Sequence, residues 1–101
     1  MKDNYTGLIK KYIQKYESSI TDIYISKKML YVEEIKDLMG TKIFDITINV
    51  KGRLVFIDPC NIANWSHECM YCFLFNDTII SVDGCNWPPT SEIEIEKIDV
   101  K

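Results

Sequence analysis

The sequence predicts an α+β fold, in which an N-terminal amphipathic helix and a second short helix pack on a twisted antiparallel sheet of about five strands. Three observations lead to this prediction. Apolar residues recur at three- and four-residue steps near the N-terminus, they alternate with polar residues in the second half, and short turn sequences separate the alternating segments. A length of 101 residues indicates one domain, spanning residues 1–101.

The first expected element is a helix that ends near Ser18 and Ser19. Asp3 or Asn4 would accept the free amide hydrogens at its start. Lysines occupy the opposite face, so the apolar stripe is expected to face the core rather than to stack nucleic-acid bases. The stripe consists of Tyr5, Leu8, Ile9, Tyr12, Ile13, Tyr16 and Ile20.

Residues 20–25 alternate in hydrophobicity and predict a strand. The following residues, 29–32, fit two interpretations, since they would either pair back as a short strand or lead into a helix. We favour a second helix over at least residues 33–39. It would end at Gly40, because glycine is the commonest left-handed residue after a helix.

The central part of the chain predicts two strands. Residues 44–50 alternate between apolar and polar side chains, as in a strand with one buried face. Lys51 and Gly52 form a turn, and residues 53–57 are almost continuously apolar, which predicts a strand covered on both faces. Pro59 then ends this strand, because proline cannot donate to a ladder.

The remaining strands are predicted after residue 69. Residues 70–75 and 78–82 would form a hairpin around Asn76 and Asp77, which tolerate a positive φ, and residues 83–84 would form a further turn. Residues 91–101 carry a glutamate-lined outer face, which is typical of an edge strand. The apolar alternation slips at residues 96–97, which predicts a bulge.

Charge is distributed unevenly along the chain, whose net charge is −3. Residues 1–28 hold six lysines against three acidic residues, whereas the rest of the chain is acidic and contains the one arginine, Arg53. This distribution makes nucleic acid an unfavourable ligand and favours a basic protein partner. The richness in Ile, Lys, Asn and Asp is typical of low-GC bacteria, their phages and other mobile elements.

The sequence contains no apolar run of the roughly 20 residues that cross a bilayer, so no membrane association is expected. Its first residues lack the apolar segment of a secretory signal. A cytoplasmic location is therefore expected, where cysteines stay free or bind metal.

Four cysteines and the single histidine, His67, are the candidate metal ligands. A Cys-x2-Cys pair and two further thiolates would complete a tetrahedral zinc site, and His67 would substitute for one thiolate. The alternative interpretation is that these cysteines pack in the core as small apolar side chains. The cysteines are Cys60, Cys69, Cys72 and Cys85.

Two tryptophan-bearing loops are the candidate recognition segments. Tryptophan is enriched in binding hot spots, although each indole would equally serve to cap one end of a small core. If the loops meet, they form an aromatic patch suited to a protein partner or to a small planar ligand such as a nucleotide. The candidate binding residues are Trp65, His67, Asn86, Trp87, Glu92 and Glu94.

The sequence thus predicts a cytoplasmic, non-enzymatic interaction protein. It has the size and charge of a phage-borne or immunity-type inhibitor that blocks a basic site on a larger protein. Two alternatives remain open: a zinc-stabilised binding domain, and a protein that binds or sequesters a nucleotide-like small molecule. No catalytic residues are assigned, because the histidine, the scattered carboxylates and the scattered glycines form no recognisable catalytic or phosphate-binding arrangement.

Overall fold

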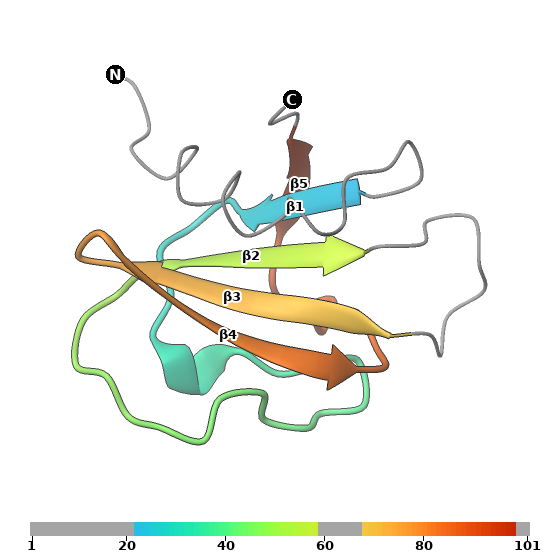
Figure 1. Cartoon of the computed structure of the whole chain (residues 1–101), viewed down its shortest axis with the longest axis horizontal. Coiled ribbons are helices and arrows are strands. Elements are labelled where there is room, and N and C mark those ends of the chain that lie inside the picture. Colours follow the sequence, from blue (N-terminus) through green and yellow to red (C-terminus); the bar gives the residue numbers. More distant parts are fainter. Residues whose placement is uncertain (1–21, 59–67, 99–101) are drawn as a thin grey trace.

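A computed structural model describes residues 22–58 and 68–98 of the chain. These residues form one antiparallel sheet in the order β4-β3-β2-β1-β5 (Figure 1). Neighbouring strands are antiparallel throughout the sheet. The strands are β1 (Asp22–Ser26), β2 (Arg53–Asp58), β3 (Cys69–Phe75), β4 (Thr78–Cys85) and β5 (Ile95–Ile98).

The α+β prediction is wrong for the described part of the chain. Residues 22–58 and 68–98 contain no α-helix and one short 3-10 turn, η2 (Val32–Glu34). The predicted N-terminal helix, which would end near Ser18 and Ser19, lies outside the described residues. Within the described ranges, no helix has the length and hydrophobicity that crossing a membrane requires.

The predicted second helix over residues 33–39 is replaced by η2 and irregular backbone. The Ile35 amide donates to the Val32 carbonyl at 3.2 Å, which closes one tight turn. The Ile35 carbonyl then accepts from the amide of Ile43 at 3.2 Å instead of from a residue one helical turn ahead. Helical spacing of apolar residues is present here, but a pairing between more distant residues takes the backbone groups that a helix would need.

A side chain ends the helical pattern at Asp37. Its Oδ1 atom accepts hydrogen bonds from the amides of Met39 and Thr41, each at 2.9 Å. A short carboxylate thus satisfies donors that a helix would bond to its own carbonyls. Gly40 does adopt the predicted left-handed conformation, with φ of +85°, but it closes this turn rather than a helix.

The strand predicted over residues 44–50 is also absent. Phe44 is buried and Ile48 half-buried, whereas Ile46 is exposed. The turn predicted at Lys51 and Gly52 does not join two paired strands. Gly52 pairs instead with Leu30, and the amide of each residue donates to the carbonyl of the other at 2.8 Å. Alternation alone does not make a strand when no neighbouring strand is positioned to complete the ladder.

The two faces of the sheet bury different sets of side chains. The prediction that residues 53–57 are covered on both faces is confirmed, since residues 54–58 of β2 are all buried. We call one side the Cys72 face and the other the Tyr71 face. The Cys72 face consists of Ile23, Ile25, Val55, Ile57, Met70, Cys72 and Leu74. From the strands, the Tyr71 face takes Leu54, Phe56, Cys69, Tyr71 and Phe73.

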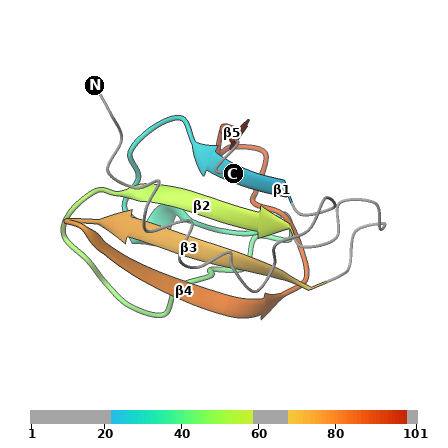
Figure 2. The same ribbon diagram turned by 45° about the horizontal axis from the view of Figure 1, so that its top comes forward.

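The Tyr71 face is covered by the long connection between β1 and β2. Val32, Ile35 and Phe44 from this connection, together with Ile93, are 0–9% exposed and join the cluster of that face. Figure 2 shows the teal part of the connection behind β2 and β3. The aromatic packing is direct, because the rings of Phe56 and Tyr71 meet edge-on with centroids 5.1 Å apart.

The predicted hairpin is confirmed between β3 and β4. Asn76 and Asp77 form its turn with φ values of +48° and +61°. The turn predicted at Asp83 and Gly84 is instead a bulge inside β4, where the register shifts by one residue and Gly84 has a φ of +73°. Glycine suits the extra residue of a bulge because it has no Cβ to clash.

β5 lies at the edge of the sheet, as its glutamates predicted. Its register with β1 is regular, so the predicted bulge at residues 96–97 is absent. The slip in apolar phase has another cause. Ile95 packs toward the Tyr71 face and Ile98 toward the Cys72 face, so the strand contributes an apolar residue to both.

Candidate partner-binding surface

The segment after β4 is bonded to the core through the carbonyl of Trp87. The Tyr71 hydroxyl, on a fully buried side chain, donates to this carbonyl at 2.7 Å. The Cys69 thiol approaches the same oxygen at 3.6 Å. The Trp87 backbone is therefore held against the end of the sheet, while its side chain is only partly buried.

A turn from the long connection lies beside this segment. The Leu38 amide donates to the Pro88 carbonyl at 2.8 Å, and the backbones of Asp37 and Pro89 form an isolated antiparallel β-bridge. On this turn Leu38 is 52% exposed and Met39 is 66% exposed. These contacts place two exposed apolar side chains next to a tryptophan-proline segment. We call Leu38, Met39, Trp87 and Pro88 together the Leu38–Trp87 surface.

Sequence reasoning missed Leu38 and Met39 because it assigned them to a helix. A signal was present, since aspartate at the first position and glycine at the fourth are typical of a type I turn. Asp37 and Gly40 occupy these positions, and the Gly40 amide donates to the Asp37 carbonyl at 2.9 Å. A turn presents its two central side chains outward, which is how these two residues become exposed.

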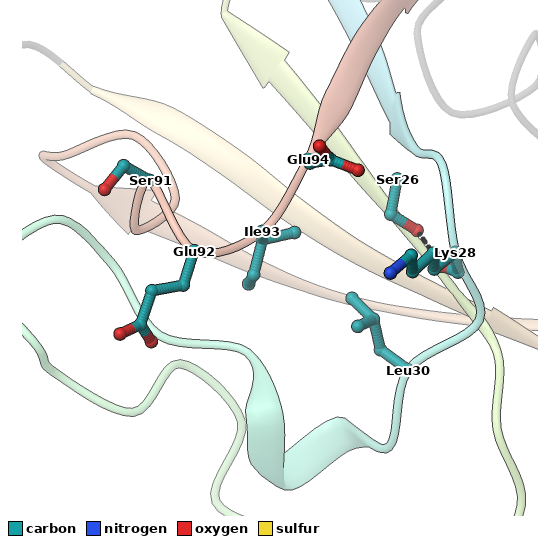
Figure 3. A pocket seen from close by; sticks show the side chains of 7 residues that line it. All are labelled: Ser26, Lys28, Leu30, Ser91, Glu92, Ile93 and Glu94. Atoms are coloured by element: carbon teal, nitrogen blue, oxygen red, sulfur yellow. Dashed lines mark hydrogen bonds between the residues drawn. The ribbon is translucent and has the colours of Figure 1, made fainter.

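Glu92 and Glu94 lie at a separate pocket at the far end of the same segment (Figure 3). The pocket has a volume of about 360 Å³, and Leu30 and Ile93 form part of its lining. Glu94 lies close to Ser26, while the Glu92 carboxylate points away from it. Two carboxylates against one lysine, Lys28, disfavour a phosphate-bearing ligand at this position.

Ser26 in this pocket is a structural residue. Its side chain is fully buried, its hydroxyl donates to the Lys28 carbonyl at 2.9 Å, and it accepts from the Leu54 amide at 3.0 Å. Because the hydroxyl both donates and accepts a hydrogen bond, it joins the end of β1 to the start of β2. It is not positioned as a nucleophile, because no general base among residues 22–58 and 68–98 bonds to it.

The predicted recognition patch is only partly described. Asn86 is exposed and Trp87 follows it directly after β4. Trp65 and His67 lie outside the described residues, so a joint patch of both loops stays a prediction. The contacts that the structure gives Trp87 are those of its carbonyl with Tyr71 and Cys69, and the long connection pairs with the residues that follow it, Pro88 and Pro89.

The four predicted metal ligands do not share one face. Cys69 and Cys85 are directly paired between β3 and β4, whereas Cys72 belongs to the opposite face of the sheet. Residues three apart in a strand point to opposite sides, so Cys69 and Cys72 would not bind the same ion. Cys60 lies outside the described residues, and within the described ranges no three metal-ligating side chains converge.

The thiols are also in an environment that favours their neutral form. Burial raises the pKa of Cys72 to about 12, and burial together with the neighbouring Cys85 raises the pKa of Cys69 to about 12. Burial raises the pKa of Cys85 as well. Metal ligation and nucleophilic attack both require the thiolate, so these environments favour structural thiols.

Replacing Tyr71 by phenylalanine is expected to lower the free energy of unfolding by about 1–2 kcal/mol, because the partly buried Trp87 carbonyl loses its 2.7 Å donor. Urea denaturation measures the change. Tyr31→Phe is the control, since Tyr31 is 43% exposed and should tolerate the change. Equal stability of the two variants would show that the hydroxyl does not hold the segment.

The described residues define a small β protein, in which an irregular connection covers one face of a single antiparallel sheet and borders an apolar surface. Comparisons of the chain with protein-family models, with curated proteins and with solved structures found no match in any of the three.

Proposed function

We propose that this protein is a non-enzymatic interaction protein that binds a protein partner through the Leu38–Trp87 surface. The observation that carries the proposal is the exposure of Leu38 and Met39 beside the Trp87–Pro88 segment. Neighbouring exposed apolar side chains are typical of interaction sites. Methionine adapts to the shape of a partner, and tryptophan buries a large rigid area.

The backbone around this surface is well anchored, which supports binding. The Asp37 carboxylate accepts hydrogen bonds from two amides of its own turn, and the Leu38 amide of the same turn donates to the Pro88 carbonyl. The Trp87 carbonyl is held by Tyr71. A surface whose backbone is already ordered loses less conformational entropy when a partner binds.

Charge supports a basic partner. The net charge is −3, and the same 86–94 segment carries the exposed Glu92 and Glu94. An excess of acidic residues on a protein increases its association rate with a basic partner even when these residues lie outside the apolar contact. The mode of action that we propose is occlusion of a basic site on a larger protein, as in a phage-borne or immunity-type inhibitor. The free thiols of Cys69, Cys72 and Cys85 support a reducing compartment such as the cytoplasm.

The test is comparative affinity enrichment from cells that contain the partner. The double variant Leu38→Glu/Met39→Glu should recover at least about tenfold less of the partner than the unchanged protein, which corresponds to roughly 1.4 kcal/mol. Ile46→Glu is the matched control, since Ile46 is 46% exposed in the same β1–β2 connection but outside the surface.

Both variants are first checked for an unchanged unfolding midpoint. Recovery that is equal for the double variant and the unchanged protein would rule out this surface. Turnover of a metabolite by purified protein, with no partner recovered, would rule out the whole proposal.

A further inference from the structure

Two of the free thiols lie opposite each other on neighbouring strands. Cys69 begins β3, and its partner across the ladder is Cys85, the last residue of β4. Both belong to the cluster of the Tyr71 face, whereas Cys72 belongs to the opposite face. The side chains of Cys69 and Cys85 therefore project from the same side of the sheet and from paired positions.

The bulge in β4 creates this pair. Tyr71 lies opposite Val82, and a regular register continued from there would place Cys69 opposite Gly84. The extra residue in β4 shifts the register by one, so Cys85 takes this place instead. Because side chains alternate between the faces of a strand, the same shift brings Cys85 to the face of Val82, three residues before it. Gly84, with a φ of +73°, supplies the backbone conformation that the extra residue needs.

The spacing of the two residues suits a disulfide. Directly paired residues of antiparallel strands have Cα atoms roughly 4.5–5.5 Å apart, within the range of about 4.4–6.8 Å that a disulfide spans. The Cys69 thiol already faces β4, since it donates to the Cys85 carbonyl at 3.3 Å. The Cys85 thiol is directed to the Val82 carbonyl at 3.8 Å. Bond formation therefore requires side-chain rotation rather than movement of the two strands.

We propose that Cys69 and Cys85 form a thiol–disulfide site, at which a small-molecule disulfide oxidises the two free thiols to a bond between β3 and β4. Oxidised glutathione is the probe for this class of oxidant. Cys85 is half-buried and meets the oxidant first, whereas Cys69 is 2% exposed and reacts second. The site is separate from the proposed partner binding and does not depend on it.

The reaction proceeds by two exchanges. The Cys85 thiol loses its proton, and its sulfur attacks oxidised glutathione, which forms a mixed disulfide and releases one glutathione thiolate that takes up a proton. The Cys69 thiol then loses its proton, and its sulfur attacks the Cys85 sulfur and releases the second glutathione in the same way. The two protein thiols thus lose two electrons and two protons, and oxidised glutathione gains both.

The environment of the thiols sets how readily this reaction occurs. Burial raises the pKa of Cys69 and of Cys85, which slows each exchange because the thiolate is the attacking species. The second exchange is favoured by position, since the attacking sulfur is held opposite its target. In a reducing compartment the pair stays as thiols, and it becomes a disulfide when the surrounding thiol pool is oxidised.

The disulfide would strengthen the end of β4, from which the Trp87 segment continues. In the reduced state the Cys69 thiol approaches the Trp87 carbonyl at 3.6 Å, and Tyr71 donates to the same oxygen at 2.7 Å. A covalent bond at Cys85 adds a cross-link to these contacts and restricts the unfolded chain. The oxidised protein should therefore unfold at a higher urea concentration than the reduced protein.

The experiment incubates the reduced full chain with oxidised glutathione, blocks the remaining thiols with iodoacetamide in denaturant and locates the products by mass spectrometry. The disulfide between Cys69 and Cys85 should exceed any other pairing of the four cysteines at least about tenfold. The reason is that, among residues 22–58 and 68–98, the fold holds only these two thiols opposite each other. In chain that is oxidised while unfolded in urea, this preference should be lost.

Two variants separate the site from a general effect of oxidation. Cys72→Val, on the opposite face, should form the disulfide and keep the rise in the urea midpoint on oxidation, whereas Cys85→Ser should lose both. The oxidation of the unchanged chain is decisive by itself if either variant fails to fold. A product that stops at the mixed disulfide, a predominant bond to Cys60 or Cys72, or no reaction of the folded chain would overturn the proposal.

Discussion

Replacing Gly52 by alanine is expected to destabilise the protein by about 3 kcal/mol, the upper part of the range for overpacking. A Cβ atom at this position would overlap the backbone carbonyl of Leu74 and would lie 2.9 Å from the ring of Phe73. Gly52 has little freedom to move away, because it exchanges two 2.8 Å hydrogen bonds with Leu30. The added Cβ would therefore collide with the Leu74 carbonyl, while the two hydrogen bonds to Leu30 keep residue 52 from moving away.

Gly40→Ala is the control for this variant. A Cβ at position 40 meets nothing within 4 Å, but Gly40 has a φ of +85°, so alanine costs about 1 kcal/mol of backbone strain alone. Urea denaturation followed by tryptophan fluorescence compares the two. A Gly52→Ala variant as stable as Gly40→Ala would mean that the contact between β3 and residue 52 is not tight.

Raising the pH from 9 to 12 is expected to lower the free energy of unfolding steeply. In the unfolded chain a thiol releases its proton near pH 9.0, whereas burial holds the pKa of Cys72 at about 12 in the folded chain. The folded state therefore binds more protons in this window, and its stability falls as pH rises. Each such thiol contributes up to about 1.4 kcal/mol per pH unit.

Cys72→Val isolates this contribution, because valine fills a similar volume and does not ionise. Its plot of unfolding free energy against pH should be flatter than that of the unchanged protein by about one thiol between pH 9 and 12. Met70→Leu on the same face is the control, as it changes packing without removing a titrating group. Parallel plots for Cys72→Val and the unchanged protein would contradict the assignment.

Elements defined by neighbouring residues could be predicted from the sequence. Asn76 and Asp77 tolerate positive φ, so the β3–β4 hairpin was determined within a few residues. The continuous apolar run of β2 predicted a strand that is buried on both faces. The glutamates before and within β5 indicated an edge. In each case the interactions that decide the structure are between residues close in the chain or are a direct effect of composition.

The candidate surface depended on contacts between distant residues. Residues 33–39 have helical spacing, yet the Asp37 carboxylate and the Pro88 carbonyl take their amides. Trp87 was recognised as a candidate from its residue type, but Leu38, which bonds the adjacent Pro88, and the following Met39 come from about fifty residues away, roughly half the chain. No local pattern contains that pairing, so the sequence did not reveal this surface.

The sequence by itself determined the hairpin turn, the fully apolar strand, the acidic edge and the residue types available for recognition, because these depend on local backbone preference and side-chain chemistry. Only the tertiary structure decided that residues 27–52 form an irregular layer on the Tyr71 face, and that Cys69 and Cys72 lie on opposite sides. The physical reason is that both outcomes follow from backbone pairing between distant segments, which outweighs the small free-energy differences of local propensity.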